Sequence, residues 1–414
     1  MFTITRRELN MTSTDIEKAE ALRKEVRAWL DENLPEKWGT PEYVAPERLS
    51  PEAQELGTSF QKRLYDAGYT GFNVAKEYGG VERPAWETAI IREELARRGT
   101  PPGPTSIGPL MVIGTLLAWG SEEQKKRFIP KILSGEEAWC EGFSEPNAGS
   151  DLANVQTTAV RDGDEWVVNG QKCWTSAWRF AHWSLLVTKT DPNAPRHRNL
   201  SYFIFPTDTP GFSRGPLKQM SGESEFGEMF FDDMRIPHEN MIGEEGRGWY
   251  VAMSTLQSER GGGVGGGAGM MGLGIRSLGG VNNLIELARN TKRYGKSFWD
   301  DKNFRHRIVQ FAIENEATRN SGTRMAIAMR KRTATGNEVS IRKNSQAERR
   351  KAQGDMVMEI IGAYSQLMRG DPRAVDNGTQ VYNMLRARGA TIEMGTSEIN
   401  RNIIAERILG LPRD

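Results

Sequence analysis

The stretch from Cys140 to Ser176 reads CEGFSEPNAGSDLANVQTTAVRDGDEWVVNGQKCWTS. It opens with small and hydroxyl-bearing residues between Ser144 and Ser150, and it closes with Trp174, Thr175 and Ser176. A segment of this composition can offer backbone N–H groups, hydroxyls and one large flat ring to a flat, anionic ligand. We therefore expect a ligand-binding surface here, and we expect the rest of the chain to be organised around it.

Hydrophobic patterning within and after this stretch predicts β-structure. Asn169-Gly170 is a strong short hairpin signal between two strand-like runs. Further short runs rich in aromatic and β-branched residues follow it, separated by Pro, Asp and Gly. The predicted runs are Glu165–Val168, Gln171–Trp174, Trp183–Thr188, Ser201–Phe205 and Glu228–Ile236. Together they predict a compact antiparallel β domain over residues 137–245.

Helical periodicity dominates on both sides of this region. Before it, helices are expected over Glu52–Ala67, Ala85–Arg98 and Gly108–Trp119, with Ser121 to Gln124 capping another helix that Pro130 breaks. After it, helices are expected over Leu278–Arg293, Asn303–Thr333 and Ser345–Leu367. The order helix, strand, helix predicts an α+β fold with segregated elements. Its domains would be a helical domain over 1–136, the β domain over 137–245 and a helical bundle over 246–414.

Composition excludes several classes of protein. The 414 residues carry 55 basic and 54 acidic side chains, a net charge of +1 that gives no reason to expect nucleic acid as a partner. Two cysteines, Cys140 and Cys173, cannot form a disulfide scaffold in a chain this long, so we expect a reducing, cytoplasmic setting. No apolar run is long enough for a membrane span. The four histidines are scattered and predict no metal site.

Three sequence blocks resemble the acyl-CoA dehydrogenase family. They are Glu141–Asp151 (EGFSEPNAGSD), Asn169–Ser176 (NGQKCWTS) and Gly395–Arg401 (GTSEINR), in the family's order and spacing. With Gly120–Glu136 and Tyr294-Gly295-Lys296, the resemblance covers essentially the whole chain. It implies a helical N-terminal domain, a middle β domain and a C-terminal helical bundle. It also implies FAD as cofactor and a homodimer or homotetramer.

The resemblance also implies roles for individual residues. Phe143 and Ser144 would lie along the flavin ring, Trp174 would stack near it, and Ser176 would hydrogen-bond close to the hydride-accepting nitrogen. Ser150 would bind phosphate or thioester-side groups at the mouth of the CoA site. Thr396 and Glu398 would lie near the adenosine moiety, and Thr396 is also a natural N-cap for the helix that follows. The remaining expected cofactor contacts are Gly149, Thr175 and Tyr294.

The expected reaction requires a carboxylate that takes the α proton of an acyl thioester. Many family members place a glutamate directly before the Gly-Thr loop, where this chain has Met394. Other members supply it from the first long helix of the C-terminal domain, where this chain has Glu259. We therefore predict Glu259 as the catalytic base, and we predict that Arg260 positions the substrate.

Seven glycines between Gly261 and Gly269 follow Glu259. Each disfavours a helix by about 1 kcal/mol relative to alanine, so we expect the absence of side chains in this tract to have a role in binding or packing. Either the tract lines an acyl pocket that admits a bulky or branched chain, or it allows close packing of two helices. Two departures from the family pattern concern FAD contacts across the subunit interface: Thr291 stands where the family usually has arginine, and Ala363 replaces a glycine.

The resemblance leads to one main hypothesis and two alternatives. The main one is FAD-dependent conversion of an acyl-CoA to a trans-2-enoyl-CoA, as in β-oxidation, with electrons passed to an electron-transfer flavoprotein. The first alternative is a flavin oxidase or monooxygenase on the same fold. The second is a non-catalytic partner subunit, because some relatives are heteromers, such as heterotetramers, in which only one chain keeps the flavin site.

Overall fold

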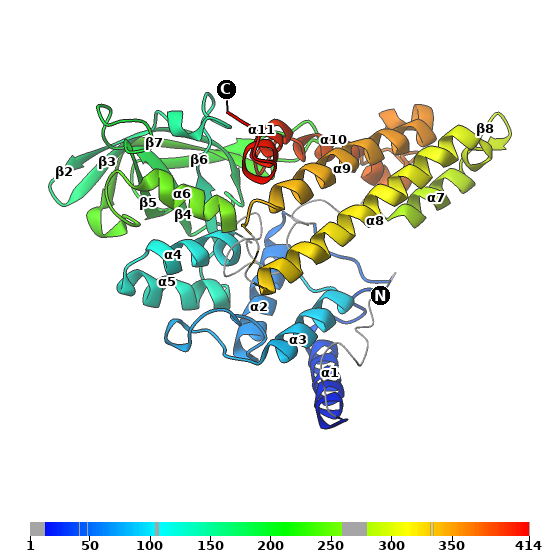
Figure 1. The fold of residues 1–414 in the computed structure, drawn as a ribbon, viewed down its shortest axis with the longest axis horizontal. Helices are drawn as coiled ribbons and strands as arrows, with labels where there is room; N and C mark the ends of the chain where they lie inside the picture. The colour runs from blue at the N-terminus through cyan, green and yellow to red at the C-terminus, as the bar shows by residue number, and fades with distance from the viewer. Residues whose placement is uncertain are drawn as a thin grey trace. The chain divides into compact units, whose positions relative to one another are not determined.

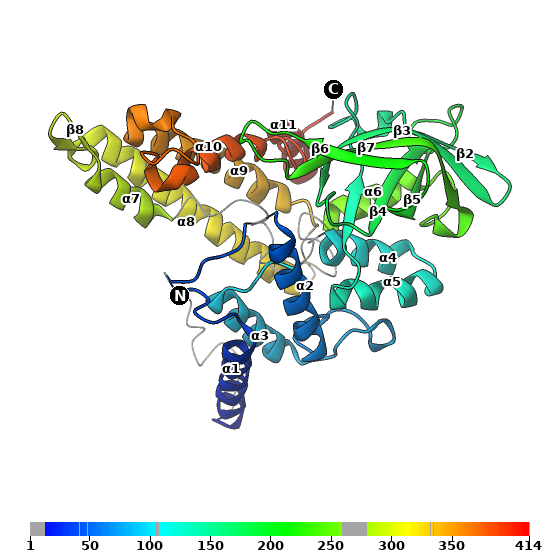
Figure 2. The same cartoon turned by 180° about the vertical axis from the view of Figure 1, so that it is seen from behind.

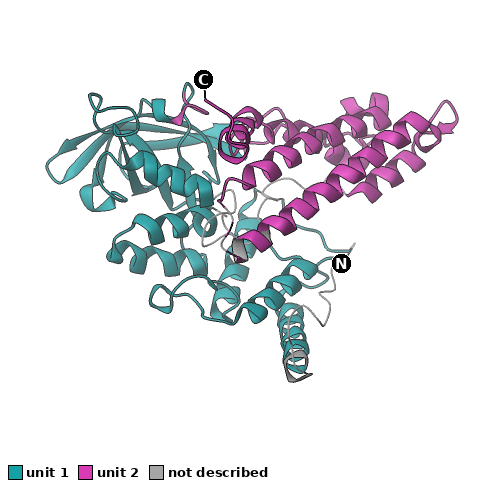
Figure 3. Ribbon diagram, viewed as in Figure 1, with its two compact units in different colours: residues 1–147, 153–217, 225–258 teal, residues 148–152, 218–224, 259–414 magenta. Residues whose placement is uncertain are grey.

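The computed structural model describes residues 13–40, 42–47, 49–103, 107–258, 280–331, 333 and 335–413. The chain divides into two compact units, coloured separately in Figure 3. Unit 1 comprises residues 1–147, 153–217 and 225–258, and unit 2 comprises residues 148–152, 218–224 and 259–414. Each unit is described by itself below.

Unit 1 begins with several helices, drawn from blue to cyan in Figure 1. Leu22, Val26 and Leu30 recur every four residues on the first helix, and all three are buried against Phe60 and Ile91. The helices of unit 1 are α1 (Ser13–Asn33), α2 (Pro51–Asp66), α3 (Ala85–Arg98), α4 (Ile113–Trp119), α5 (Glu122–Ser134) and α6 (Gly248–Gln257). A π-helical turn, Gly108–Val112, leads directly into α4, and short 3-10 turns lie at Lys76–Tyr78, Leu152–Asn154 and His238–Asn240.

The α5 helix confirms one prediction and corrects another. Ser121 and Gln124 form the predicted capping box, in which each side chain accepts a hydrogen bond from the other residue's backbone N–H. Pro130 does not break the helix, which continues to Ser134. A proline removes one backbone donor, and in this helix the buried residues Phe128, Ile129, Ile132 and Leu133 keep both sides of Pro130 packed in place.

A buried carboxylate joins α1 to α3. Glu94 accepts hydrogen bonds from Arg27 at 2.8 and 2.9 Å, from Arg97 at 2.8 Å and from Arg23 at 3.1 Å. These bonds, with that of Arg27 the largest influence, lower the pKa of Glu94 to about 2. Because the lowered pKa belongs to the folded state, Glu94 stabilises the fold fully above its ordinary value of 4.5 and loses that effect as the pH falls towards 2.

Replacing Glu94 by glutamine is expected to lower the free energy of unfolding by about 3 kcal/mol at pH 7. At pH 3 the loss shrinks by about 2 kcal/mol, because wild-type Glu94 contributes less to the free energy of unfolding at that pH. Urea unfolding at both pH values measures the difference. Glu93→Gln is the matched control, since Glu93 is exposed and pairs with Arg23 at the surface, and it should change stability little. Equal losses for the two variants would refute the prediction.

The sheet of unit 1 is predominantly antiparallel. Its strands are β1 (Trp139–Gly142), β2 (Thr158–Asp162), β3 (Glu165–Ser176), β4 (Trp183–Lys189), β5 (Leu200–Pro206), β6 (Phe212–Leu217) and β7 (Phe226–Pro237). They pair in the order β1-β4-β2-β3-β7-β6, and β5 also pairs with β4. The sheet is not wholly antiparallel as predicted, because β1 and the first residue of β2, Thr158, pair with β4 in parallel. Trp166, Phe203, Phe205, Met229 and Ile236 form the core of this sheet.

The predicted hairpin at Asn169-Gly170 is wrong. These residues lie inside the single strand β3, where the pairing with β7 shifts register. Asn169 bonds across the strands, donating to the Asp233 carboxylate at 2.8 Å and accepting from the Asp233 N–H at 2.9 Å. A Cβ on Gly170 would lie 2.7 Å from Thr157 Cα, so the glycine permits close strand approach. The actual turn between β2 and β3 lies at Gly163-Asp164.

Unit 2 is a bundle in which α8 and α9 lie side by side in both views (Figures 1 and 2). Its helices are α7 (Val281–Asn290), α8 (Lys302–Arg330), α9 (Val339–Ile361), α10 (Thr379–Gly389) and α11 (Ser397–Ile403), and its hairpin strands are β8 (Lys292–Arg293) and β9 (Lys296–Ser297). Short turns at Phe298–Asp300, Gly362–Gln366 and Val375–Gly378 and a π-helical turn at Ile404–Ile408 complete it. The α9 helix begins at Val339 rather than the predicted Ser345, because Val339, Ser340 and Lys343 are already buried.

The order of elements confirms the predicted fold class, with helices before and after a β region. None of the helices formed by the described residues combines the length and hydropathy of a membrane span.

Candidate functional site

The first sequence block begins in β1, the strand that pairs with β4 at one end of the sheet order. Phe143 follows β1 directly, is buried, and packs edge-on against Tyr202 of β5, with ring centroids 5.7 Å apart. Ser144 comes next and is half-buried. Its carbonyl oxygen accepts a hydrogen bond from the Cys173 N–H at 2.9 Å, so the first and second blocks lie side by side.

A buried ion pair holds these two blocks together. The Lys172 side chain is fully buried, and its Nζ donates to Glu145 Oε1 at 2.8 Å and to the Phe143 carbonyl at 3.0 Å. Glu145 also accepts from the backbone N–H groups of Gln156, at 2.6 Å, and Thr157, at 2.9 Å. The carboxylate is therefore a structural group that fixes the loop.

Both members of this pair are charged at neutral pH. Burial lowers the pKa of Lys172 to about 8, although the charge of Glu145 opposes the shift. Burial acts to raise the pKa of Glu145, but the charge of Lys172 and the hydrogen bonds outweigh it, and the net direction is downward. A charged pair in a low-dielectric interior leaves a costly unpaired charge when either partner is removed. The site therefore depends on both residues.

The second block leaves the regular strand through a β-bulge. The pairing of β3 with β7 shifts between Lys172 and Thr175, and Trp174 in the bulge has a left-handed φ of 62°. Ala177 also has a positive φ, of 60°. Non-glycine residues in this conformation are strained and are kept only where the surroundings fix them. The result is a tryptophan that is 55% exposed near the end of β3, with its ring 6.0 Å from Phe226.

Thr175 and Ser176 end the same strand. Thr175 is fully buried, and its Oγ1 has no hydrogen-bond partner within the described part of the chain. A buried hydroxyl without a partner is unfavourable, so this oxygen is available to a ligand group. Ser176 is half-buried opposite Phe226 of β7. Unit 1 thus brings together five of the predicted residues: Phe143, Ser144, Trp174, Thr175 and Ser176.

Gly149 and Ser150 belong to unit 2 and are both exposed. A Cβ placed on Gly149 would meet no atom within 4 Å. Packing among the described residues therefore gives no reason for a glycine at this position.

The third block forms a tight turn in unit 2. Met394 and Gly395 have left-handed φ values of 56° and 83°, and Thr396 then caps α11 by accepting from the Ile399 N–H at 3.1 Å. Asn400 fixes the turn by donating to the carbonyls of Gly395, at 2.8 Å, and Thr396, at 2.9 Å. The predicted N-cap role of Thr396 is confirmed. On the exposed side of α11, the Glu398 carboxylate lies 3.7 Å from the Arg401 guanidinium.

Tyr294 occupies the tip of the β8–β9 hairpin. It and Gly295 both have positive φ, 54° and 77°, as a two-residue type I′ turn requires. Asparagine or glycine normally takes this first position, so a tyrosine that is 94% exposed stands there at a conformational cost. The guanidinium of Arg293 lies 5.6 Å from its ring centre.

Glu259 and Arg260 lie outside the described residues. The helix that precedes them, α6, is described to Ser258, whose φ and ψ of −62° and −42° are still helical. Glu393, the acidic residue beside Met394, is engaged in an ion pair with Arg386, with an N···O distance of 2.9 Å. Met394 has no carboxylate, and the Glu393 carboxylate at the same turn is paired with Arg386.

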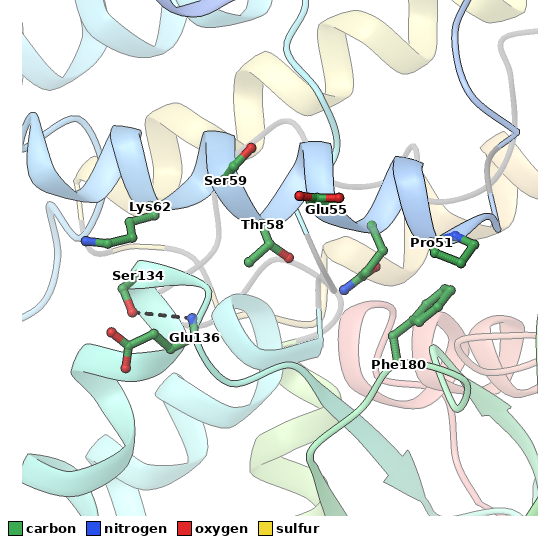
Figure 4. Close-up of a pocket in the computed structure, with 9 residues that line it drawn as sticks. Pro51, Glu55, Thr58, Ser59, Lys62, Ser134, Glu136 and Phe180 are labelled. Carbon is green, nitrogen blue, oxygen red and sulfur yellow. Dashed lines mark hydrogen bonds between the residues drawn. The ribbon is translucent and has the colours of Figure 1, made fainter.

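A hollow of about 390 Å³ lies elsewhere in unit 1 (Figure 4). It is lined by α2 residues together with Ser134, Glu136 and Phe180, and Ser134 Oγ accepts from the Glu136 N–H at 3.4 Å. None of its lining residues belongs to the predicted site. Within the described ranges, no group of three or more His, Cys, Asp or Glu side chains is placed to hold a metal ion.

Several residues that shape the site were not predicted from the sequence. Lys172 was read as one residue of a hairpin strand, and only the fold shows that it is buried beneath the first block. Lys172 is two residues from both Gly170 and Trp174, so strand alternation would place all three on one face of β3. The bulge disturbs that alternation. Asn400 gave no signal, because its role depends on the turn at Gly395.

Comparison with known proteins finds three family domains in successive parts of the chain. The family descriptions "Acyl-CoA dehydrogenase, N-terminal domain", "middle domain" and "C-terminal domain" match residues 16–136, 140–234 and 246–409. "Acyl-CoA dehydrogenase IpdE1" of Mycolicibacterium smegmatis is 38% identical over 408 residues, covering 96% of this chain and 99% of the relative.

Two solved structures are similar over nearly their whole length. The "Tcur3481-Tcur3483 steroid ACAD G363A variant" has a TM-score of 0.73 and 30% identity, covering 96% of this chain and 100% of that one. The "ChsE4-ChsE5 complex from Mycobacterium tuberculosis" has a TM-score of 0.73 and 29% identity, covering 96% of this chain and 98% of that one.

Proposed function

The chain belongs to the acyl-CoA dehydrogenase family of oxidoreductases, and on that premise we propose that it converts an acyl-CoA to a trans-2-enoyl-CoA with FAD as cofactor. The observation that carries the proposal is the joining of the first two blocks. The Cys173–Ser144 hydrogen bond and the buried Lys172–Glu145 pair hold Phe143 and Ser144 beside the bulge that exposes Trp174.

The residues of unit 1 fit a flavin. A flavin ring system needs a flat apolar surface and a few fixed polar groups. Trp174 offers an exposed ring, and Thr175 Oγ1 is a buried hydroxyl that lacks a partner among the described residues. Phe143, Ser144 and Ser176 would complete this face. Gly149, Tyr294, Thr396 and Glu398 would contact the rest of FAD, and Ser150 would bind the cofactor or the CoA thioester.

Glu259 is the proposed base. Its carboxylate would take the α proton of the thioester, a double bond would form between Cα and Cβ, and the hydride would leave Cβ. FAD, when bound, supplies the hydride acceptor. Met394 cannot accept a proton and Glu393 is paired with Arg386, which leaves Glu259 as the candidate that the family pattern offers. Arg260 would position the substrate by charge-assisted hydrogen bonds.

A bulky acyl chain is the proposed substrate class. One similar structure is described as a steroid acyl-CoA dehydrogenase. The glycine tract 261–269, which lies outside the described residues, would leave room for a ring-bearing chain. Electrons would pass to an electron-transfer flavoprotein, and the protein would work in the cytoplasm.

The test is a substrate panel with the purified protein. Hexanoyl-CoA, isobutyryl-CoA and a steroid-side-chain acyl-CoA are supplied with an artificial electron acceptor, and the enoyl-CoA product is identified by mass. The proposal expects bound FAD and a product two mass units below the substrate, formed fastest from the steroid thioester. Absence of any enoyl-CoA from an FAD-loaded protein would contradict the function. A faster reaction with hexanoyl-CoA would contradict only the substrate class.

The oligomeric assembly has two candidate forms. A homodimer or homotetramer is the general expectation, whereas the ChsE4-ChsE5 structure is described as a complex of two components. Thr291 and Ala363, which depart from the family pattern, would fit a chain that relies on a different partner for FAD contacts. Purification of the chain alone distinguishes the two forms. Bound FAD and dehydrogenase activity would support the homo-oligomer, and loss of both would support a complex with a different partner chain.

Tyr294→Asn is expected to lower the affinity for FAD without destabilising the protein. Asparagine is favoured at this position of a type I′ turn, so the hairpin keeps its shape while the aromatic ring is lost. We expect an unchanged or higher Tm of the apoprotein and a Kd for FAD raised by about tenfold, which corresponds to the roughly 1–3 kcal/mol that aromatic contacts contribute. Apoprotein titration with FAD measures it. An unchanged Kd would remove Tyr294 from the cofactor site.

A further inference from the structure

The α8 helix of unit 2 is buried along one face only. Within its unit it packs against α7, α9 and the short turn that precedes it (Figure 1). The residues that face these elements are apolar and belong to the core of the bundle: Phe304, Ile308 and Phe311. Thr318, on the same side of the helix, is also buried and shares a hydrogen bond with Ser345 of α9 at 2.7 Å.

The opposite, outward face of α8 also carries apolar side chains. Val309, Ile313 and Ile327 are 51%, 58% and 48% exposed. A helix that meets solvent on one side normally carries polar residues there. Single exposed apolar residues are common on protein surfaces, so the arrangement of these three matters more than their number.

The outward residues of α8 have the spacing of a coiled-coil seam. They follow one another in alternating steps of four and three: Val309, Ile313, Glu316, Asn320, Thr323 and Ile327. All six are exposed. Two helices that carry such a repeat pack along it with interlocking side chains. With a rise of about 1.5 Å per residue, this seam is about 27 Å long.

The chemistry of the seam is symmetric about Asn320. Ile313 and Ile327 lie seven residues before and after it, and Glu316 and Arg324 lie four residues before and after it. In an antiparallel pair with the two Asn320 side chains opposite each other, Ile313 of one copy meets Ile327 of the other. Glu316 likewise meets Arg324, and two-fold symmetry repeats each contact. The seam is therefore complementary to itself.

The charges favour this antiparallel arrangement. A parallel pair in register would place Glu316 against Glu316 and Arg324 against Arg324, which is unfavourable. Arg324 has no ion-pair partner in the part of the chain that the structure describes. Glu316 accepts from Arg319 at 2.8 Å and from Asn320 at 3.3 Å, both on its own helix. Such exposed contacts contribute little, so they do not prevent Glu316 from pairing across the seam.

We propose that the outward face of α8 is a surface through which two copies of this chain associate, with the two helices antiparallel and Asn320 on the two-fold axis. An asparagine within an apolar seam fixes the register of the helices, and that is the role of Asn320 here. The inference concerns assembly and does not depend on the proposed reaction.

A cross-link at position 320 tests the arrangement directly. Two cysteines form a disulfide when their Cα atoms lie within about 7 Å of each other, which the two copies of residue 320 satisfy at the axis. Mild oxidation of Asn320→Cys should convert most of the chain to a disulfide-linked dimer. The native Cys140 and Cys173 are buried and do not compete. Glu314→Cys is the matched control, because Glu314 is exposed on α8 but lies about 120° round the helix from Asn320. It should stay uncross-linked.

Charge reversal tests the pairing of Glu316 with Arg324. Either Glu316→Arg or Arg324→Glu places like charges across the seam and should raise the Kd of association by about tenfold. The double variant Glu316→Arg/Arg324→Glu restores opposite charges, so its Kd should return to within about threefold of wild type. Ile313→Glu introduces a charge into the apolar part of the seam and should halve the sedimenting mass. Sedimentation of the purified full-length chain measures all four proteins.

Three results would overturn the inference. The first is a wild-type chain that sediments as a single 46.4-kDa molecule. The second is an assembly whose mass and Kd are unchanged by Ile313→Glu and by both single charge reversals. The third is equal cross-linking of Asn320→Cys and Glu314→Cys. Both cysteine variants replace exposed side chains, so the cross-linking test remains decisive if Ile313→Glu fails to fold. None of these results bears on flavin reduction, which the substrate panel tests separately.

Discussion

Glu259→Gln is expected to leave a folded, FAD-loaded protein whose flavin is reduced by acyl-CoA about 10²- to 10⁴-fold more slowly than in wild type. Glutamine preserves the size of the side chain and can form hydrogen bonds, but it cannot accept the α proton. Binding of the thioester and of FAD should change little, because the remaining site residues are intact. Stopped-flow absorbance under anaerobic conditions measures the rate.

The matched control is Glu393→Gln. Glu393 is the other glutamate near the family's two base positions, and its carboxylate is paired with Arg386 at 2.9 Å. Loss of this pair should lower stability and leave the rate of flavin reduction within a few-fold of wild type. If Glu393→Gln abolished reduction while Glu259→Gln did not, the assignment of the base would be wrong even though the reaction class would stand.

Lys172→Met is expected to be the most damaging change in unit 1. It would leave the Glu145 carboxylate buried without its counter-ion, although the backbone N–H groups of Gln156 and Thr157 would still donate to it. Removal of one member of a buried ion pair typically costs about 3–5 kcal/mol. We expect a fall of that size in the free energy of unfolding, measured by urea unfolding, and loss of FAD on purification, because Phe143 loses its bond to Lys172.

A double-mutant cycle distinguishes the pair from its members. Glu145→Gln alone leaves the Lys172 ammonium buried without its counter-ion, and it should also be strongly destabilising. The double variant Glu145→Gln/Lys172→Met contains no unpaired buried charge. It should be less destabilised than the sum of the two single variants by about 2 kcal/mol or more. Additive losses would show that the two residues act independently, contrary to the structure.

Local sequence signals predicted those elements that depend on a single segment. The Ser121 capping box and the N-cap role of Thr396 each involve residues close in the sequence, and both are present. The runs of aromatic and β-branched residues in β4, β5 and β7 are predicted for the same reason. The family blocks added the cofactor and the reaction, which local patterns alone do not contain.

The errors occurred where distant segments decide the local structure. Asn169-Gly170 is a hairpin signal in isolation, but pairing with Asp233 and close approach of Thr157 make it a bulged position inside a long strand. Pro130 is tolerated within a helix whose flanking residues are buried. Neither the ion pair of Lys172 with Glu145 nor the hydrogen bond between Thr255 and Thr115 could be predicted, because the partners lie 27 and 140 residues apart in the sequence.

The central claim is that the flavin of this protein is reduced directly by an acyl-CoA. The measurement is anaerobic titration of the purified, FAD-loaded protein with acyl-CoAs of different chain type, followed at the absorbance of oxidised flavin. The account predicts bleaching by at least one of them, followed by rapid recovery with an electron-transfer flavoprotein and slow recovery with O₂. Fast recovery with O₂ would instead indicate an oxidase. Persistent flavin absorbance with every acyl-CoA, in a protein that contains FAD, would contradict the claim.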